Sequence, residues 1–317
     1  MPVCEADPWR LQFFEGVFCP EHIRIPTEDA DAYLWNPAHN WIYDKLRIAL
    51  SQGIEAAPHG VPPSRYPVFS KPVTNMKGMG VESYILNTRQ DYEAHYKPGH
   101  MWMTLLEGEH VSTDCAVVDG EARWWRHTTG VPLRAGTFDY WIVHAAPRPR
   151  LEDYLGRWLN TNMRGYTGLM NFETIGGAII ESHMRFADQW PDLYGEAWVE
   201  AAIGLYSEGL WRFADRNRID GYSVVLFGTH GCRFRHPAPD IQAAALALPS
   251  VSSLQNTYHE NRAPKDHAMP PGGFRLAIIN CTDLESGFAA RRIVASGYPA
   301  ACLLLPEAVL ATAATAR

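Results

Sequence analysis

Two carboxylates, Glu173 and Glu181, flank a Gly-Gly dipeptide in a segment whose residue pattern predicts two short strands, 166–173 and 178–183. Carboxylates that face each other across a hairpin repel, which costs stability. A divalent cation between them removes that cost, because hard cations bind carboxylate oxygens. The pair is therefore a candidate metal site.

The register of this hairpin decides whether the two carboxylates meet. A two-residue turn sets Glu173 opposite Ile180, and Glu181 then faces the other side of the sheet. A loop of three or five residues sets Glu173 directly opposite Glu181. In that register His183 lies near Asn171. The sequence permits both registers, and it also permits an ordinary solvent-exposed hairpin that binds nothing.

Basic residues upstream of the hairpin are candidates for contact with phosphate oxygens. Lys45 lies on a predicted helix, and Lys71 ends an apolar strand, where a lone charge needs a partner. The loop 73–81 adds Lys77 among glycines, whose backbone N–H groups can approach an anion closely. This loop lacks the Walker spacing of glycine and lysine and precedes a strand, so it is not a Walker loop. Either Lys45 or Lys71 alone can equally be a solvated surface residue.

Between the lysines and the carboxylates, an apolar strand at 101–106 becomes polar at Gly108 and continues to Asp114. Such a strand suits a hinge between two subdomains, with free backbone groups that could meet the edge of an adenine. A buried edge strand explains the same pattern equally well.

The elements that must position these residues mix helices and strands along the chain. We expect helices over 41–52, 88–96, 151–159 and 196–214, and strands over 66–71, 81–86, 101–106, 109–118, 122–129, 166–173, 178–183, 222–227 and 274–279. This order indicates an α+β fold with an antiparallel sheet in the middle. We expect an N-terminal arm or reduced subdomain at 1–40, a middle domain at 41–220 and a C-terminal domain at 221–317.

Composition narrows the class of protein. The 317 residues carry 28 basic and 35 acidic side chains, a formal net charge of −7, which argues against a general nucleic-acid binder and against disorder. The six cysteines are scattered without a C-x-x-C pair, so we expect a reducing compartment and no disulfide framework. We see no signal peptide and no apolar run long enough to span a membrane. The expected location is the cytoplasm.

Taken in order, these features resemble the ATP-grasp superfamily over about residues 40–215. The matching features are the helix with Lys45, the strand ending in Lys71-Pro72, the glycine loop, the hinge strand at 103–108, and the run Asn171…Glu173…Glu181-Ser182-His183-Met184-Arg185. That family comprises ligases, carboxylases and related enzymes that hold Mg-ATP between two α+β subdomains. The strands at 222–227 and 274–279 are similar to the region after the grasp in biotin-carboxylase-like members.

The resemblance implies a fold and a set of site residues. The expected fold is an ATP-grasp fold of two α+β subdomains, a small lid at about 66–103 and a core at about 104–220, with a C-terminal α/β extension. The residues expected to contact the nucleotide are Lys45, Lys71, Lys77, Gly78, Gly80, Met103, Thr104, Leu105 and His110. The residues expected to bind Mg²⁺ or Mn²⁺ are Glu173, Glu181 and His183. The residues expected to take part in catalysis are Lys71 and Arg185, the latter facing the transferred phosphoryl group or the acyl intermediate.

The sequence also departs from the family pattern. The usual Glu-x-Asn is Glu181-Ser182-His183 here, and the position of the acid that usually meets the ribose falls on His110. The hinge glutamate is replaced at Met103 or Thr104. Fewer than 45 residues stand before Lys45, so most of the domain that precedes a typical grasp is missing.

The function that the resemblance implies is an ATP-dependent ligase. It would activate a carboxylate as an acyl phosphate, for attack by an amine or another nucleophile. The expected partners are a small-molecule carboxylate and an amine, with no nucleic acid and no membrane; a homodimer is compatible with the sequence. Two alternatives remain open: a nucleotide-binding protein that has lost its chemistry, and a small-molecule kinase on the same fold.

Overall fold

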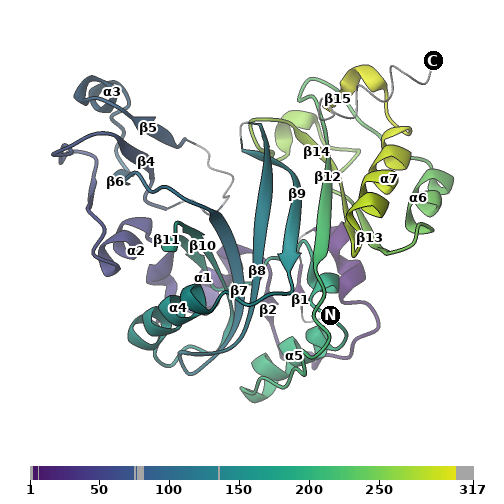
Figure 1. Ribbon diagram of the computed structural model, residues 1–317, viewed down its shortest axis with the longest axis horizontal. Coiled ribbons are helices and arrows are strands. Elements are labelled where there is room, and N and C mark those ends of the chain that lie inside the picture. The colour runs from purple at the N-terminus through teal and green to yellow at the C-terminus, as the bar shows by residue number, and fades with distance from the viewer. Residues whose placement is uncertain (1–2, 6, 75, 77–81, 135, 305–317) are drawn as a thin grey trace.

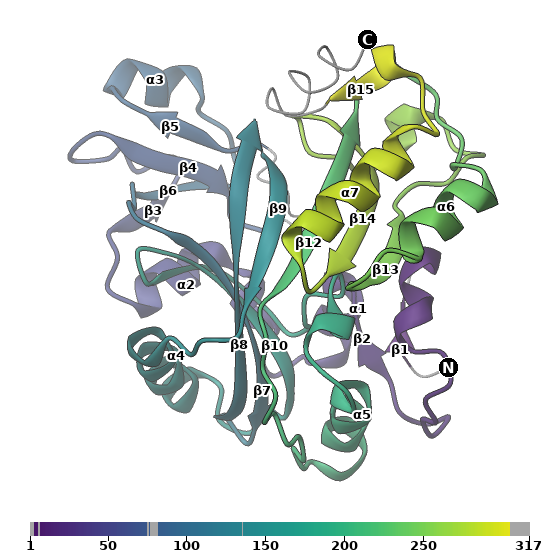
Figure 2. The same cartoon turned by 45° about the vertical axis from the view of Figure 1, so that its right-hand side comes forward.

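The computed structural model describes residues 3–5, 7–74, 76, 82–134 and 136–304. The described strands form a nine-stranded sheet, a four-stranded sheet and a two-stranded ribbon. Figures 1 and 2 show the four-stranded sheet at one end of the large sheet and the C-terminal helices at the other.

The large sheet is antiparallel in the order β11-β10-β7-β8-β9-β12-β14-β13, with β15 paired to β12. Its strands are β7 (His110–Val118), β8 (Glu121–Arg134), β9 (Thr137–His144), β10 (Gly168–Ile175), β11 (Ala178–His183), β12 (Gly221–Gly228), β13 (Val251–Asn256), β14 (Phe274–Cys281) and β15 (Leu303–Leu304). β12 pairs with β9, with Gly221 opposite Val143. One sheet therefore runs across the boundary that we expected at residue 220.

The small sheet has the order β3-β6-β4-β5 and is also antiparallel. Its strands are β3 (Ala56–Pro58), β4 (Val68–Pro72), β5 (Tyr84–Leu86) and β6 (His100–Thr104). Helix α3 (Arg89–Ala94) follows β5 and begins with a capping box. The Thr88 hydroxyl accepts the Asp91 N–H, and the Asp91 carboxylate accepts the Thr88 N–H. This sheet contains the strands expected in the lid and adds β3.

The remaining helices are α1 (Asp29–Trp35), α2 (Lys45–Ser51), α4 (Pro149–Asn162), α5 (Trp198–Glu208), α6 (Pro239–Leu246) and α7 (Leu284–Ala295). Short 3₁₀ turns lie at Pro8–Phe13, Asn40–Tyr43, Pro191–Leu193, Pro264–Asp266 and Ala300–Cys302. The single helix expected over 41–52 was wrong, because extended Asp44 ends the 3₁₀ turn and caps α2 by accepting the N–H of Arg47 at 3.0 Å. The helix expected to reach 214 ends at Glu208, where Gly209 takes a left-handed φ of 69°.

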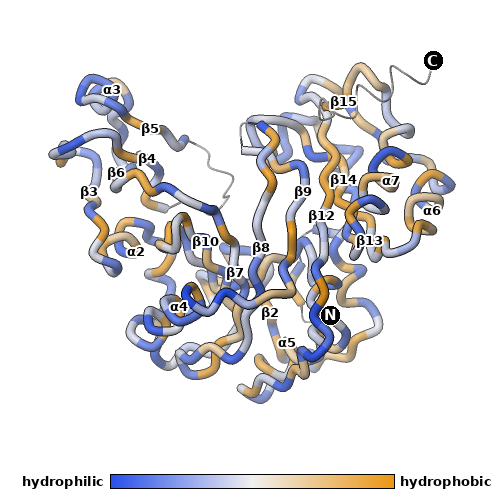
Figure 3. Tube along the Cα trace, in the orientation of Figure 1, coloured by the Kyte–Doolittle hydropathy of each residue, from blue (hydrophilic) through white to orange (hydrophobic). Residues whose placement is uncertain are grey.

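The two faces of the large sheet are covered differently. Cys115 and Val117 of β7 pack with Leu155 of α4 on one face, whereas Ala116 packs with Trp198 of α5 on the other. Because side chains alternate along a strand, the even-numbered residues of β7 share the face of Ala116. Figure 3 shows hydrophobic stretches along β12 and β14, whereas α3 at the outer part of the small sheet is largely hydrophilic.

The N-terminal residues form a packed part of the molecule rather than a free arm. Strands β1 (Val3–Cys4) and β2 (Ile25–Pro26) pair in parallel. Phe14 and Ile25 are buried in the same core cluster as Trp198 of α5. This packing holds the start of α1 next to the end of β11.

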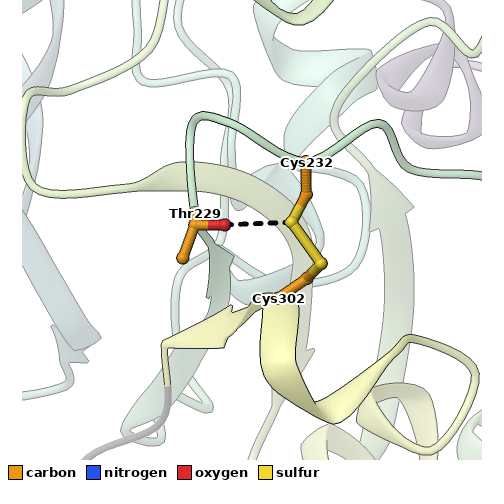
Figure 4. Close-up of a disulfide and its surroundings, with 3 residues drawn as sticks. All are labelled: Thr229, Cys232 and Cys302. Carbon is orange, nitrogen blue, oxygen red and sulfur yellow. Dashed lines mark hydrogen bonds between the residues drawn. A yellow bond between two sulfur atoms is a disulfide. The ribbon is translucent and has the colours of Figure 1, made fainter.

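The expectation of no disulfide was wrong, because Cys232 and Cys302 are bonded to each other (Figure 4). The bond joins the loop after β12 to the turn before β15, and the hydroxyl of Thr229 donates to the Cys232 sulfur at 3.1 Å. Cys19, Cys115 and Cys281 form no disulfide. None of the helices in the described part of the chain combines the length and the apolar character that crossing a membrane needs.

Candidate active site

The β10–β11 hairpin brings the two predicted metal carboxylates together. Its turn is the two-residue Gly176-Gly177 turn, with φ values of 57° and 87°, and it pairs Ile175 with Ala178. A bulge between Glu173 and Thr174 then shifts the register, so that Glu173 lies directly opposite Glu181.

The loop of odd length that we expected for this pairing was therefore wrong. The bulge has the same effect as such a loop. Ile180 is an extra residue of β11, and its insertion allows Glu173 to pair with Glu181 despite the two-residue turn. His183 pairs with Asn171, as the metal hypothesis requires.

Lys71 reaches this bulge from the small sheet. Its Nζ donates to the carbonyl oxygen of Ile180 at 2.7 Å, which gives the inserted residue a partner outside the ladder. The lysine is buried, and burial together with the nearby Lys45 ammonium lowers its pKa to about 8. A buried cation thus connects β4 to the β10–β11 hairpin.

Lys45 approaches from the start of α2. Its ammonium lies 2.5 Å from Oε1 of Glu181. At the other end of this helix, the Gln52 side chain accepts the Ile179 N–H at 2.7 Å and donates to the Ile179 carbonyl at 2.8 Å. These two bonds satisfy the free edge of β11 and fix α2 against it.

Glu173 has a different partner, His110 at the start of β7. The imidazole Nε2 lies 3.1 Å from Glu173 Oε2. Burial would raise the pKa of Glu173, but the hydrogen bond and the charge of His110 lower it to about 2. Burial likewise disfavours charged His110, yet the bond with Glu173 outweighs it and raises the pKa of the imidazole. The expected ribose contact of His110 stays a prediction.

Asp29, the first residue of α1, was not expected in the site. Its Oδ1 lies 2.9 Å from Nδ1 of His183, and Arg185 holds both of its oxygens, with Nε 2.9 Å from Oδ1 and Nη2 3.1 Å from Oδ2. Although burial opposes the charge, His183 and Arg185 keep the pKa of Asp29 well below its usual range. No local pattern marks Asp29, because His183 and Arg185 lie more than 150 residues away from it.

The expected hinge connects the two sheets. β6 is hydrogen bonded on both edges, so Met103 lies between Ala56 and Phe69, and the N–H of Thr104 donates to Glu55 at 2.9 Å. Leu105, by contrast, lies beyond the strand, and its backbone makes no hydrogen bond with any residue that the structure describes. The backbone outside the strand pairing therefore begins at Leu105 and continues at Leu106, and its contact with an adenine edge stays a prediction.

The hinge also packs directly on the hairpin turn. Gly108 has a φ of 119°, and a Cβ added there would lie 2.8 Å from the Cα of Gly176. A Cβ on Gly176 would in turn lie 2.3 Å from the carbonyl oxygen of Glu107. The two glycines thus allow the hinge and the β10–β11 hairpin to touch. Lys77, Gly78 and Gly80 of the predicted glycine loop lie outside the described residues.

The predicted metal ligands have the right chemistry, although their atoms are spread. Oε1 of Glu181 and Nε2 of His183 are 4.0 Å apart, while Glu173 is turned toward His110. Within the described ranges, only Glu5, Asp7 and Glu28 bring three such ligand atoms within 4.8 Å of one another. Two carboxylates and an imidazole suit a divalent cation such as Mg²⁺ or Mn²⁺, so the donor set fits.

The fold can be compared with solved structures. No family model matches the chain, and no curated protein matches it. Phosphoribosylamine–glycine ligase from Thermotoga maritima superposes with a TM-score of 0.59 and 14% identity, over 90% of this chain and 84% of that one. A carboxyaminoimidazole ribonucleotide synthase from Aspergillus clavatus, complexed with ATP, gives 0.56 and 14%, over 81% and 72%.

An L-amino acid ligase from Bacillus licheniformis is similar as well, with a TM-score of 0.54 and 11% identity, over 84% of this chain and 72% of that one. These structures are ATP-grasp ligases. The protein therefore has the α+β ATP-grasp fold that its motifs indicated. At such low identity the likeness establishes the fold, and the activity has to be argued from the site.

Proposed function

We propose that this protein is an ATP-dependent ligase that activates a carboxylate as an acyl phosphate and joins it to an amine. One observation carries the proposal. Lys45 and Lys71, from two different elements, converge on the hairpin that holds Glu173 and Glu181, at the junction between the small and large sheets.

The lysines supply the charge for a nucleotide. A triphosphate of about −4 needs local cations to approach a protein with a net charge of −7, and two buried ammonium groups next to each other provide them. The adenine would lie along the free backbone of Leu105 and Leu106 between the sheets, and His110 would face the ribose.

Glu173, Glu181 and His183 would hold the divalent cation. A bound Mg²⁺ or Mn²⁺ neutralises phosphate charge and orients the terminal phosphoryl group. The protein's own groups then have two tasks: Lys71 stabilises negative charge on the phosphates, and Arg185 offers a guanidinium beside the site.

The chemistry has two steps. A carboxylate oxygen of the substrate bonds to the γ-phosphorus of ATP while the bond to ADP breaks. The amine then bonds to the acyl carbon, phosphate leaves, and the nitrogen gives up a proton. Neither step needs a covalent bond to the protein, so placement of the reactants accounts for the catalysis.

The test is ADP release from ATP with a pool of carboxylates and amines, followed by mass spectrometry of the product. A ligase sustains ADP release over many turnovers only when an acid and an amine are both present, because the acid alone carries the reaction no further than the acyl phosphate. The variant Lys71→Ala should abolish ADP release. The control is Lys97→Ala, which removes an exposed lysine near the small sheet that is paired with Glu82, and it should leave ADP release unchanged.

Other outcomes identify the alternatives. ADP release with one acceptor and a stable phosphorylated product indicates a small-molecule kinase. Nucleotide binding without turnover on any pool indicates a protein that has lost its chemistry. The contact of Arg185 with Asp29 favours this last alternative over the kinase, because it occupies the guanidinium expected to face the reacting group.

A further inference from the structure

We infer that Asp29 is a positioning residue that fixes His183 with its Nε2 toward Glu181, so that the metal centre of this protein contains an imidazole nitrogen. The inference rests on the proposed nucleotide site. It assigns a role in that site to the N-terminal segment.

The geometry of the ring leaves one nitrogen for a metal. Nδ1 of His183 lies 2.9 Å from Asp29 Oδ1, and both side chains are about 95% buried. Arg185 Nη2, which can only donate, also lies near Nδ1, but at the longer distance of 3.3 Å. The closer partner is the carboxylate, which can only accept, so Nδ1 carries the hydrogen. The neutral ring then presents its lone pair at Nε2, which lies 4.0 Å from Oε1 of Glu181. Two ligand atoms at that separation can share one cation.

Asp29 is itself held in place from several sides. The Arg185 guanidinium contacts both of its oxygens, at 2.9 and 3.1 Å, and the Tyr43 hydroxyl donates to Oδ1 at 3.3 Å. The Tyr43 ring also packs edge-on against the His183 ring, with centroids 6.2 Å apart. The imidazole is thus fixed both by a hydrogen bond and by packing.

A carboxylate behind a ligating histidine fixes its tautomer and raises its basicity. Removing such a partner typically costs 10- to 100-fold in metal affinity. A nitrogen ligand also favours Mn²⁺ over Mg²⁺, which prefers oxygen. Asp29 should therefore influence both the strength and the choice of metal, although it touches no metal itself.

The opposing explanation is that Asp29, His183 and Arg185 only clamp the N-terminal segment to the sheet. Both explanations predict a loss of stability on mutation. Only the proposal predicts that an imidazole nitrogen coordinates the metal, so the test must observe the ligands of the metal directly.

The experiment uses the full chain with Mn²⁺ and a non-hydrolysable ATP analogue, and records pulsed electron paramagnetic resonance. Protein labelled with ¹⁵N-histidine separates a protein imidazole from the nitrogens of the nucleotide. We expect coupling of Mn²⁺ to ¹⁵N in the labelled wild type, and loss of that coupling in His183→Asn. Mn²⁺ binding without ¹⁵N coupling would overturn the inference and leave the nucleotide site standing. Failure of Mn²⁺ and nucleotide to bind at all would overturn the proposed function, and the inference with it.

Calorimetric metal titrations in the presence of the same analogue then test Asp29. We expect Asp29→Asn to weaken Mn²⁺ binding 10- to 100-fold and to lower the preference for Mn²⁺ over Mg²⁺. Asp31→Asn, on the same helix and without a contact to His183, is the matched control and should match the wild type. Asp29→Glu keeps the carboxylate and should recover part of the preference. An unchanged preference in folded Asp29→Asn, judged by thermal denaturation, would leave Asp29 a clamp only.

Discussion

Glu173 and Glu181 lie directly opposite each other on β10 and β11, and each carboxylate has its own basic partner, His110 for Glu173 and Lys45 for Glu181. Two like charges at this position would otherwise destabilise the sheet. These partners offset that cost without a metal, and Lys45 is also one of the groups that we propose to contact the nucleotide phosphates. Metal and nucleotide binding should therefore be coupled, because a nucleotide that attracts Lys45 releases Glu181 for the metal.

The first prediction concerns this coupling. We expect ATP to bind only together with a divalent cation, and Lys71→Ala to weaken binding by about 1.5–3 kcal/mol through loss of one charged hydrogen bond. Isothermal titration with and without EDTA measures both effects. Lys97→Ala serves as the control. An unchanged ATP affinity in Lys71→Ala would remove Lys71 from the site.

The second prediction is a pH dependence of nucleotide affinity. The pKa of Lys71 is lowered to about 8 from 10.5, so its ammonium is present below pH 8 and is lost above it in the absence of ligand. Phosphate favours the charged form, and binding above pH 8 must therefore take up a proton. ATP affinity should fall by up to tenfold per pH unit above about pH 8. Lys71→Arg, whose side chain stays charged, should show a flat profile over pH 7–9.5. Parallel profiles for the two proteins would contradict this assignment.

The third prediction separates the two glycines of the hairpin turn. Both have positive φ, so alanine at either position costs about 1 kcal/mol or more. A Cβ on Gly177 meets nothing within 4 Å, whereas a Cβ on Gly176 would lie 2.3 Å from the Glu107 carbonyl oxygen. Gly176→Ala should therefore lower the free energy of unfolding by about 1–3 kcal/mol more than Gly177→Ala. Chemical denaturation of the two variants measures the difference, and equal losses would show that the hinge does not rest on the turn.

Much of the fold followed from local patterns, and the predicted strand at 178–183 has the observed bounds. The hairpin of β8 and β9 was missed beyond residue 129, because β8 continues through Gly130 and Pro132, residue types that usually interrupt strands. A register shift beside Pro132 accommodates the missing N–H. The helix and strand within 228–273 were missed in a segment rich in proline, alanine and serine.

Some parts of the candidate site could likewise be predicted from the sequence, and others could not. Lys45, Lys71, Glu173 and Glu181 could be predicted as a group, because their order along the chain resembles that of the ATP-grasp superfamily. The bulge at Ile180 was not, since alternation of side chains fits either register until the backbone is seen. Asp29 was not recognisable either, because only the packing of the N-terminal segment carries it to His183.

The last prediction concerns the disulfide between Cys232 and Cys302. These cysteines are 70 residues apart, and closing a loop of that length restricts the unfolded chain. In the chain-entropy description, its removal lowers the free energy of unfolding by up to about 4 kcal/mol. We expect reduction of the wild type and the variant Cys302→Ser to destabilise the protein to the same extent, as measured by chemical denaturation. Cys302→Ser should show no further response to reductant. Cys19→Ser, in a half-buried cysteine outside any disulfide, is the control and should keep the full sensitivity to reductant. If reductant leaves the wild-type unfolding curve unchanged, the bond does not form in solution, and the original expectation of unpaired cysteines would be restored.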